Sequence, residues 1–219
     1  MKNVADIYAL SPMQKLMLLH ARMSRRKNDV LFNQIVYEIN GVLDTKAYQR
    51  AWQLLVDRHP ALRTIFVWQD GKEPVQVVRE HATLPWTEHD WRELSTIEQE
   101  REFNHLLAAD RELGFDLLQA PLMRMNLIRK EENGYLLAWS SHHLVIDRWC
   151  IAIIFEEIKS AYEAYITGSF PVLAPAPRYS DYIAWMAKQD KNELQAYWNA
   201  VLHDTQARPL ALKSATEDV

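Results

Sequence analysis

The sequence predicts an α/β (α+β) fold in which a mixed, mostly antiparallel sheet is flanked by helices. Segments with strand-like and helix-like patterns alternate along the 219 residues, which is typical of layered α/β proteins. Two pairs of apolar segments are joined by the turn dipeptides Asp70-Gly71 and Asn133-Gly134, which predict antiparallel hairpins. Hydrophobic residues make up 48% of the chain, enough for a packed core.

The expected strands are short apolar or alternating runs bounded by turn residues. The segment between Val78 and Ser95 is polar and is expected to be an irregular crossover. The expected strands are Phe32–Ile39, Leu62–Trp68, Pro74–Val78, Leu122–Ile128 and Tyr135–Trp139.

The expected helices carry start signals. Ser11-Pro12 places a cap residue before a proline, Asp44 begins a second helix, and Ser95 with Glu98 forms a capping box. The helices are expected from Pro12, from Asp44 to about His59, from Thr96 to Glu112, from Trp149 to Ile166, near Ser180–Gln189 and near Asn192–Leu202. In the first of them an apolar stripe, formed by Met13, Leu16, Met17 and His20, is predicted to face the core.

The composition excludes several classes of function. The net charge of −4 gives no basic field for nucleic acid or an anionic membrane. The single cysteine, Cys150, excludes an internal disulfide and suits a reducing compartment. No secretory leader and no apolar run of ~18 residues occurs, and no GxGxxG, Walker, CxxC or GxSxG motif is present. We therefore predict a cytoplasmic protein without a tightly bound cofactor.

Chemistry-bearing residues gather where the last expected strand leads into a long helix. His142 and His143 follow the strand, and Asp147 lies four residues after the second histidine. Histidine can take and return a proton near neutral pH. Asp147 could instead simply cap the helix, and the histidines could be satisfied core residues. Three converging ionisable groups are costly unless they are used or paired, which favours a site.

Two other chemistries are less favoured at this point. Adjacent histidines on a strand face opposite sides, so they do not readily share a metal ion. Cys150 lies near the helix start, where a thiol can be activated as a nucleophile. Its position within an apolar helical face favours a small packing residue.

Several stretches together resemble the condensation domains of nonribosomal peptide synthetases. His142 to Arg148 is similar to the HHxxxDG motif, and Arg58 to Phe66 to the RHxxLRTxF motif. Further matches are Tyr8–Gln14, Phe115–Arg124 and Tyr179–Trp185. The matches cover only the front half of such a domain, which has two lobes resembling chloramphenicol acetyltransferase with the active site in a tunnel between them. The resemblance implies that residues 1–204 are the N-terminal, donor-side lobe and that 205–219 are an inter-lobe linker or tail.

The resemblance also implies an acyltransferase activity of secondary metabolism. An acyl thioester, carried on phosphopantetheine or coenzyme A, would react with the amine of a carrier-bound amino acid. His143 would be the catalytic histidine and His142 a supporting one. Asp147 would be structural, paired with Arg63. The missing C-terminal lobe would be a partner, without which the isolated lobe is expected to be inactive.

The sequence departs from the resemblance directly after Asp147. The glycine of the motif is replaced by Arg148, followed by Trp149, and both are expected to border the substrate channel. Arg148 would fill part of this channel and favour short acyl donors. Alternatively, Arg148 points to solvent or pairs with a carboxylate outside the channel, or the site is degenerate and the lobe is a noncatalytic interaction module.

The start of the chain bears on the donor. The first matched motif begins at Tyr8, so no carrier domain is expected before it, and the donor would arrive in trans. Acyl-coenzyme A is the simplest such donor, which predicts a starter condensation domain of lipopeptide biosynthesis. The alternative is a domain fed by another synthetase's carrier through a docking segment, for which the short leader offers little room. A further alternative is a complete trimeric, coenzyme A-dependent acetyltransferase, disfavoured because helices follow the histidine motif.

Overall fold

The computed structural model describes residues 3–23, 30–203 and 205. Residues up to Ile183 form one compact unit, and the chain from Ala184 onward forms a second. Of the segment 205–219, predicted to be a linker or tail, all but Thr205 lies outside the described residues.

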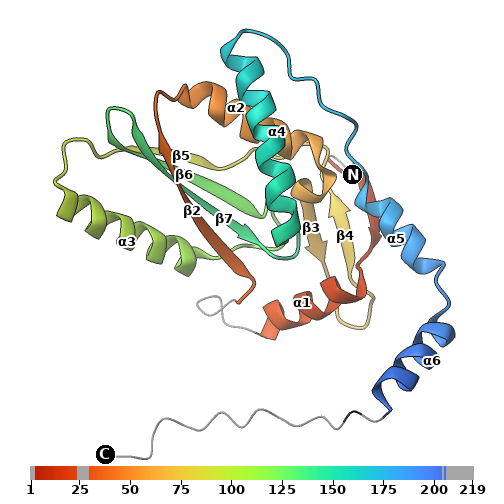
Figure 1. Ribbon diagram of the computed structural model, residues 1–219. Coiled ribbons are helices and arrows are strands. Elements are labelled where there is room, and N and C mark those ends of the chain that lie inside the picture. Colours follow the sequence, from red (N-terminus) through yellow and green to blue (C-terminus); the bar gives the residue numbers. More distant parts are fainter. Residues whose placement is uncertain (1–2, 24–29, 204, 206–219) are drawn as a thin grey trace, which may run out of the picture. The chain divides into compact units, whose positions relative to one another are not determined.

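A four-stranded sheet carries the histidine motif (Figure 1). Its order is β2 (Phe32–Asn40), β7 (Gly134–His142), β6 (Met123–Glu131) and β5 (Trp86–Asp90). The β2–β7 and β6–β7 pairs are antiparallel, whereas β5 is parallel to β6. The strand β7 therefore lies inside the sheet, with a hydrogen-bonded neighbour on each side.

A second sheet has three antiparallel strands. It contains β1 (Asp6–Ala9), β4 (Val75–Val78) and β3 (Thr64–Val67), in that order. The predicted hairpin around Asp70-Gly71 is confirmed. The strand expected from Leu62 begins later, because Pro60–Arg63 forms the 3-10 helix η2 with proline in its first turn. The mixed, mostly antiparallel α/β fold predicted from the sequence is confirmed.

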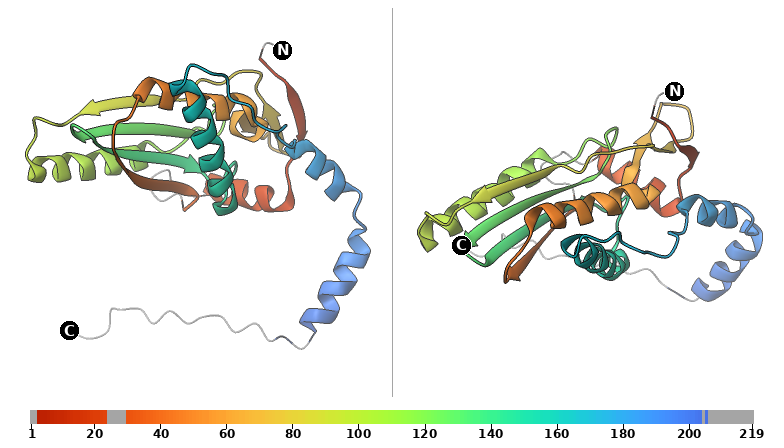
Figure 2. Two further views of the ribbon diagram at one scale, coloured as in Figure 1. Left: turned by 45° about the horizontal axis from the view of Figure 1, so that its top comes forward. Right: turned by 90° about the horizontal axis from the view of Figure 1, so that it is seen from above.

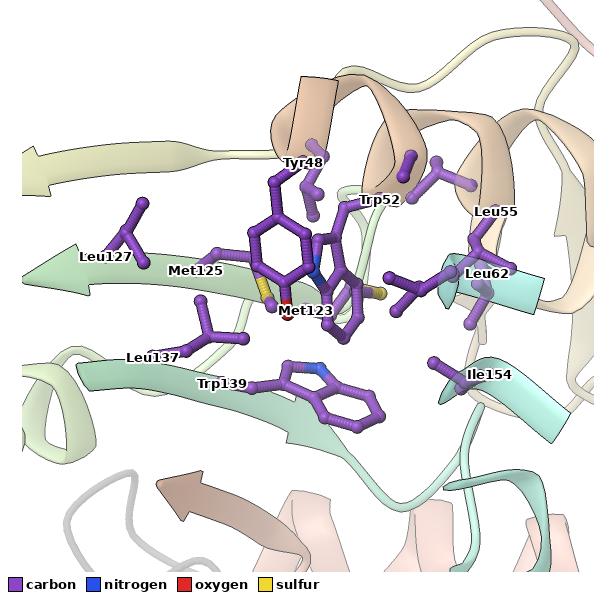
Figure 3. Packing of buried hydrophobic residues seen from close by; sticks show 14 of the residues in the cluster. Tyr48, Trp52, Leu55, Leu62, Met123, Met125, Leu127, Leu137, Trp139 and Ile154 are labelled. Atoms are coloured by element: carbon purple, nitrogen blue, oxygen red, sulfur yellow. The ribbon is translucent and has the colours of Figure 1, made fainter. Parts of the chain in front are cut away.

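Helices cover both faces of the four-stranded sheet (Figure 2). The main core lies between one face and the helices α2 (Thr45–Arg58) and α4 (Arg148–Ile166). Figure 3 shows Trp139 of β7 facing Trp52 of α2, with ring centroids 5.1 Å apart. Both indole rings are fully buried, and burying large aromatic rings is a major contribution to core stability.

The opposite face of the sheet is covered by α3 (Thr96–Leu113). Asp110 of α3 accepts a hydrogen bond from Gln34 of β2 at 2.9 Å and one from Ser140 of β7. These sheet residues alternate with the residues that face α2 and α4, as strand geometry requires. A second apolar cluster includes Leu18 of α1 (Pro12–Met23) and Leu144. Leu144 lies in the turn that follows β7, called the motif turn below.

The helix caps agree with the sequence, whereas one predicted core face does not. Asp44 caps α2 and the Ser95–Glu98 capping box begins α3, as predicted. In α1, however, the buried residues are Gln14 and Leu18. Met13 and Leu16 are 59% and 61% exposed, and His20 is exposed, so the prediction that the stripe faces the core is wrong for these residues. Met17 is partly buried against an apolar cluster, as predicted.

Two helices follow a Pro-rich segment. They are α5 (Tyr179–Ala187) and α6 (Lys191–Leu202), close to the helices expected near Ser180 and Asn192. Neither contains a buried residue. Within the part of the chain that the structure describes, no helix is long and apolar enough to cross a membrane.

Candidate functional site

The candidate site is the turn from His143 to Asp147, between the end of β7 and the start of α4. The N–H of His143 donates to the carbonyl of Leu31 at 2.9 Å, and the N–H of Val145 donates to that of His142 at 3.1 Å. The turn is therefore held by backbone hydrogen bonds at the end of an inner strand of a rigid sheet, a place where folds present functional side chains.

His142 is an internal anchor of this turn. Its ring is 1% exposed, and Nδ1 accepts a hydrogen bond from the N–H of Leu144 at 3.1 Å. The ring also packs edge-on against Phe115, with centroids 6.4 Å apart. These contacts hold the His142 ring in place, and its supporting role in catalysis stays a prediction.

His143 is only partly buried and has a defined hydrogen-bond direction. Nδ1 lies 3.2 Å from the carbonyl oxygen of Ile146. A carbonyl oxygen can only accept, so Nδ1 must donate, and in the neutral ring Nε2 then carries the lone pair. Nε2 has no hydrogen-bond partner among the described residues. The turn thus fixes the direction of the His143 ring and leaves Nε2 as the acceptor.

His143 lines a cavity of about 250 Å³. Its walls come from α1, the three-stranded sheet, the motif turn, the first turn of α4 and the first residue of α5. Besides the motif turn, the lining residues include Met13, Gln14, Thr64, Gln76, Cys150 and Tyr179. Burial raises the pKa of Tyr179 above its ordinary value, and a hydrogen bond with the Ser11 side chain opposes this effect.

Cys150 is a neutral thiol in this environment. Burial raises its pKa, and Sγ donates to Oδ1 of Asp147 at 3.2 Å. A nucleophilic cysteine requires a lowered pKa, so the structure favours the packing role over the nucleophile.

Asp147 and Arg63 do not form the ion pair expected from the resemblance, and that prediction is wrong for the described residues. Asp147 is the N-cap of α4, and its Oδ1 accepts from the N–H of Cys150 at 3.0 Å. The Arg63 guanidinium instead donates to backbone carbonyls, at 2.9 Å to Val56 and to Glu80 and also to Arg79. Val56 lies in the last turn of α2, where carbonyls lack intrahelical partners. Asp147 and Arg63 therefore each hold a different part of the backbone and do not contact each other.

A cluster that the sequence analysis missed joins α2 to α4. Arg58 makes a bidentate contact with Glu157, at 3.0 Å and 3.2 Å, and His59 lies 2.7 Å from the same carboxylate. Arg58 also donates to the carbonyl of Ala174 in the Pro-rich segment. The signal was present in the RHxxLRTxF match, whose first two residues are Arg58 and His59.

The cluster borders an apolar cavity of about 280 Å³. This cavity lies between the end of α2, the first turns of α4 and residues 174–177. Four of its residues also line the His143 cavity: Ala61, Val145, Ile146 and Cys150. The motif turn is therefore the common wall of two cavities.

A second missed cluster lies beneath α3. The side chains of Asp110 and Arg124 form a buried ion pair, and Arg124 also donates to the carbonyl of Gly114 at 2.6 Å. The Arg124 guanidinium lies over the ring of Phe115, 4.4 Å from its centroid. Phe115 in turn contacts His142, so this cluster supports the anchor histidine.

Arg148 and Trp149 form the exposed start of α4. Trp149 is 86% exposed, and neither residue lines the His143 cavity. Arg148 is exposed and has no side-chain partner within the described ranges. Their predicted place beside a substrate channel stays a prediction. Among all the residues that the structure describes, no group of three or more His, Cys, Asp or Glu residues could hold a metal ion.

An oriented histidine above a cavity, at a strand-to-helix turn of a mixed sheet, defines a candidate proton-transfer site. The family model for the condensation domain matches residues 4–218. The chain therefore belongs to the condensation domain family.

Curated relatives are nonribosomal peptide synthetases. The chain is 36% identical to part of a linear gramicidin synthase of Brevibacillus parabrevis over 216 residues, which are 98% of this chain and 4% of that protein. It is 35% identical to bacitracin synthase 3 of Bacillus licheniformis over 199 residues, or 91% of this chain and 3% of that one. The chain thus spans a small part of these relatives.

Solved structures share the fold. The starter condensation domain of rhizomide synthetase RzmA superposes with a TM-score of 0.77 at 19% identity, covering 92% of this chain and 49% of that domain. The first condensation domain of the calcium-dependent antibiotic synthetase gives a TM-score of 0.76 at 20% identity, covering 93% of this chain and 51% of that one. The chain spans about half of each solved domain.

Proposed function

We propose that residues 1–204 are the N-terminal, donor-side lobe of a condensation domain that joins an acyl thioester to an amine, with His143 as the base. One observation carries this proposal. The Ile146 carbonyl fixes Nδ1 of His143 as a donor, which leaves Nε2 as an acceptor in a ring that borders a cavity. Membership of the condensation domain family supports the reaction class.

In the proposed reaction the amine nitrogen attacks the thioester carbonyl carbon. A C–N bond forms as the carbonyl π bond opens, and the tetrahedral intermediate then expels the thiolate as the C–S bond breaks. Nε2 of His143 removes the proton from the attacking amine and returns it to the departing thiolate. The products are an amide and a free thiol. General base catalysis of this kind contributes roughly 10² to 10⁴ in rate.

The other motif residues are proposed to hold this base in place. His142 anchors the turn through Leu144, and Asp147 fixes the start of α4. Arg63 ties η2 to the carbonyls that follow β4. Tyr179 lines the same cavity and is proposed to contact a bound substrate.

We further propose that the donor is an acyl-coenzyme A and the acceptor a carrier-bound aminoacyl group, as in a starter domain. A variant of the RzmA starter domain has been solved in complex with C8-CoA and Leu-SNAC. Coenzyme A and a carrier present the thioester on the same phosphopantetheine arm, so one cavity can serve either source. Arg148, at the exposed start of α4, is proposed to narrow the donor channel and favour short acyl groups.

The test joins this chain to the second half of its condensation domain. Acyl-coenzyme A and a carrier-bound amino acid are supplied, and the N-acyl product is measured by mass spectrometry. His143→Ala is expected to lower turnover by roughly 10² to 10⁴. His89→Ala is the matched control, because His89 is also partly buried and hydrogen-bonded, to Asn126 on another part of the sheet. Near-normal turnover of a folded His143→Ala domain would sink the proposal.

A further inference from the structure

Two glutamines are buried beside the motif turn, although glutamine is usually found at protein surfaces. Gln14 of α1 is 7% exposed and Gln76 of β4 is 1% exposed. Both line the His143 cavity, and the proposed reaction uses neither of them. Buried amides are retained only where their donors and acceptors are satisfied, so their partners indicate what they do.

The two side chains form a reciprocal amide pair. Nε2 of Gln76 donates to Oε1 of Gln14 at 3.0 Å, and Nε2 of Gln14 donates to Oε1 of Gln76 at 3.3 Å. Gln76 uses its second N–H on the carbonyl of Ala9 at 3.0 Å, and Oε1 of Gln14 also accepts from the N–H of Ser11 at 3.0 Å. The pair is thus fixed to the backbone on both sides.

The remaining N–H of Gln14 reaches the motif turn. It donates to the carbonyl oxygen of Leu144 at 3.2 Å. Leu144 follows His143, and two residues later the Ile146 carbonyl accepts from Nδ1 of His143. The N–H of Leu144 is already held by His142. Both peptide groups of Leu144 are therefore fixed, its N–H by the anchor histidine and its C=O by Gln14.

We infer that Gln14 is a positioning residue, which acts through the Leu144–Ile146 turn to keep the Nδ1 proton of His143 on the Ile146 carbonyl and Nε2 available as the base. This inference rests on the proposed function. A side-chain amide suits the task because it donates and accepts at once. A carboxylate would place an oxygen against the Leu144 carbonyl oxygen, and a methionine would leave that carbonyl without its donor.

The test compares Gln14→Met and Gln14→Glu, of which the second keeps the shape and the acceptor atoms should the first fail to fold. Gln53→Met is the matched control. Gln53 of α2 is partly buried, and its side-chain amide likewise both donates and accepts. It donates to the carbonyl of Ala82 and accepts from the N–H of Leu84, both at 2.9 Å. Neither of these partners lines the His143 cavity, so Gln53→Met removes comparable hydrogen bonds without touching the turn.

Turnover is measured per folded molecule in the chain joined to its second half. Each Gln14 variant is expected to lower kcat by about 10²-fold, the scale that a misplaced catalytic group produces, with KM for both substrates within about threefold. Gln53→Met is expected to lose thermal stability while keeping kcat. Two-bond ¹H–¹⁵N spectra of the His143 ring give a second reading: the Nδ1–H form should dominate in the wild type and in Gln53→Met, and mix with the Nε2–H form in the Gln14 variants.

The inference is overturned if the Gln14 variants keep kcat within about twofold of the wild type, if Gln53→Met loses as much, or if the His143 ring keeps one tautomer throughout. His143→Ala is run beside them. Should it keep its turnover, the proposed function itself fails, and the tautomer spectra still decide whether Gln14 positions the ring.

Discussion

Nε2 of His59 lies 2.7 Å from a carboxylate oxygen of Glu157, so the residue that ends α2 is joined to α4. Arg58 binds the same carboxylate, and all three side chains are at most 20% exposed. Burial raises the pKa of Glu157, but the hydrogen bonds from Arg58 and His59 outweigh this effect and hold its pKa below the ordinary value. The cluster thus contains a carboxylate stabilised in its charged form.

Glu157→Gln is expected to lower the free energy of unfolding at pH 7 by about 1 kcal/mol, since an ion pair that is only partly buried contributes less than a fully buried one. Because the pKa of Glu157 is lowered in the fold, the stabilisation is present above the ordinary pKa of about 4.3 and is lost as the pH falls through the folded value. The difference between wild type and variant in urea unfolding should therefore shrink below pH 4. The exposed neighbour Glu156→Gln should show no such pH dependence.

Asp147→Ala is expected to lower the free energy of unfolding by about 1 kcal/mol, the usual cost of removing an N-cap. Asp147→Asn should lose only a fraction of this, because asparagine also caps helices well. Since Asp147 and Arg63 share no ion pair, the double variant Asp147→Ala/Arg63→Ala should be additive within about 0.5 kcal/mol. A coupling energy well above 1 kcal/mol in urea unfolding would instead restore the ion pair expected from the resemblance.

Cys150 should react slowly with iodoacetamide in the folded chain. Its raised pKa lowers the thiolate fraction at any given pH, and the thiolate is the reactive form. The midpoint of the rate against pH should lie above about 8.5, the ordinary value for cysteine, and the same thiol in urea-unfolded chain serves as the reference. A midpoint below this value would reopen the nucleophile interpretation.

Arg148→Ala should shift donor preference towards longer acyl chains in the joined domain. Each buried methylene gains about 0.8 kcal/mol where an apolar space is open to it, and burying an alkyl chain against a guanidinium would strip its water without replacement. The measurement is a competition between acetyl- and octanoyl-coenzyme A. Lys159→Ala, which removes an exposed cation from the same helix, is the control. An unchanged product ratio would leave the acyltransferase proposal standing without the channel role.

The 219-residue chain alone should form no measurable amide, whereas adding the second half of the domain should restore turnover. The chain spans only about half of the solved domains, 49% and 51% of two of them, and Trp149 next to the motif is 86% exposed. A substrate channel is expected to need both halves. Turnover by the isolated chain, with and without the partner half, decides this prediction.

The fold could be predicted where local signals agree with the packing. The turn dipeptides, the Ser95–Glu98 box and the Asp44 cap act over a few residues, so the sequence alone reveals them. The strand β5 was missed because its pattern, Trp-Thr-Glu-His-Asp, is polar and exposed at the sheet edge. The strand β1 was missed for a similar reason, since it is short and mostly exposed.

The sequence predicted which residues form the candidate site, but not which groups each of them contacts. Asp147 was recognised as a possible cap from its position before a helix, and this is the role that the structure shows. That Arg63 binds backbone carbonyls and not Asp147 depends on how η2 is oriented, which no local pattern encodes. Gln14 was not predicted as a site residue, because a polar residue next to apolar ones in a helix is usually expected to face solvent. In the structure Gln14 is buried, whereas the neighbouring Met13 is exposed.

The register of β7 decides which histidine faces the cavity. Along its nine residues β7 is paired with β2, from Phe32 opposite His142 to Asn40 opposite Gly134, and it is paired with β6 on its other side. A slip of one residue would turn every side chain of the strand to the other face, and the ring of His143 would no longer face the cavity. The length of these ladders therefore does more than stabilise a sheet: it fixes which of two adjacent histidines is buried and which one borders the cavity.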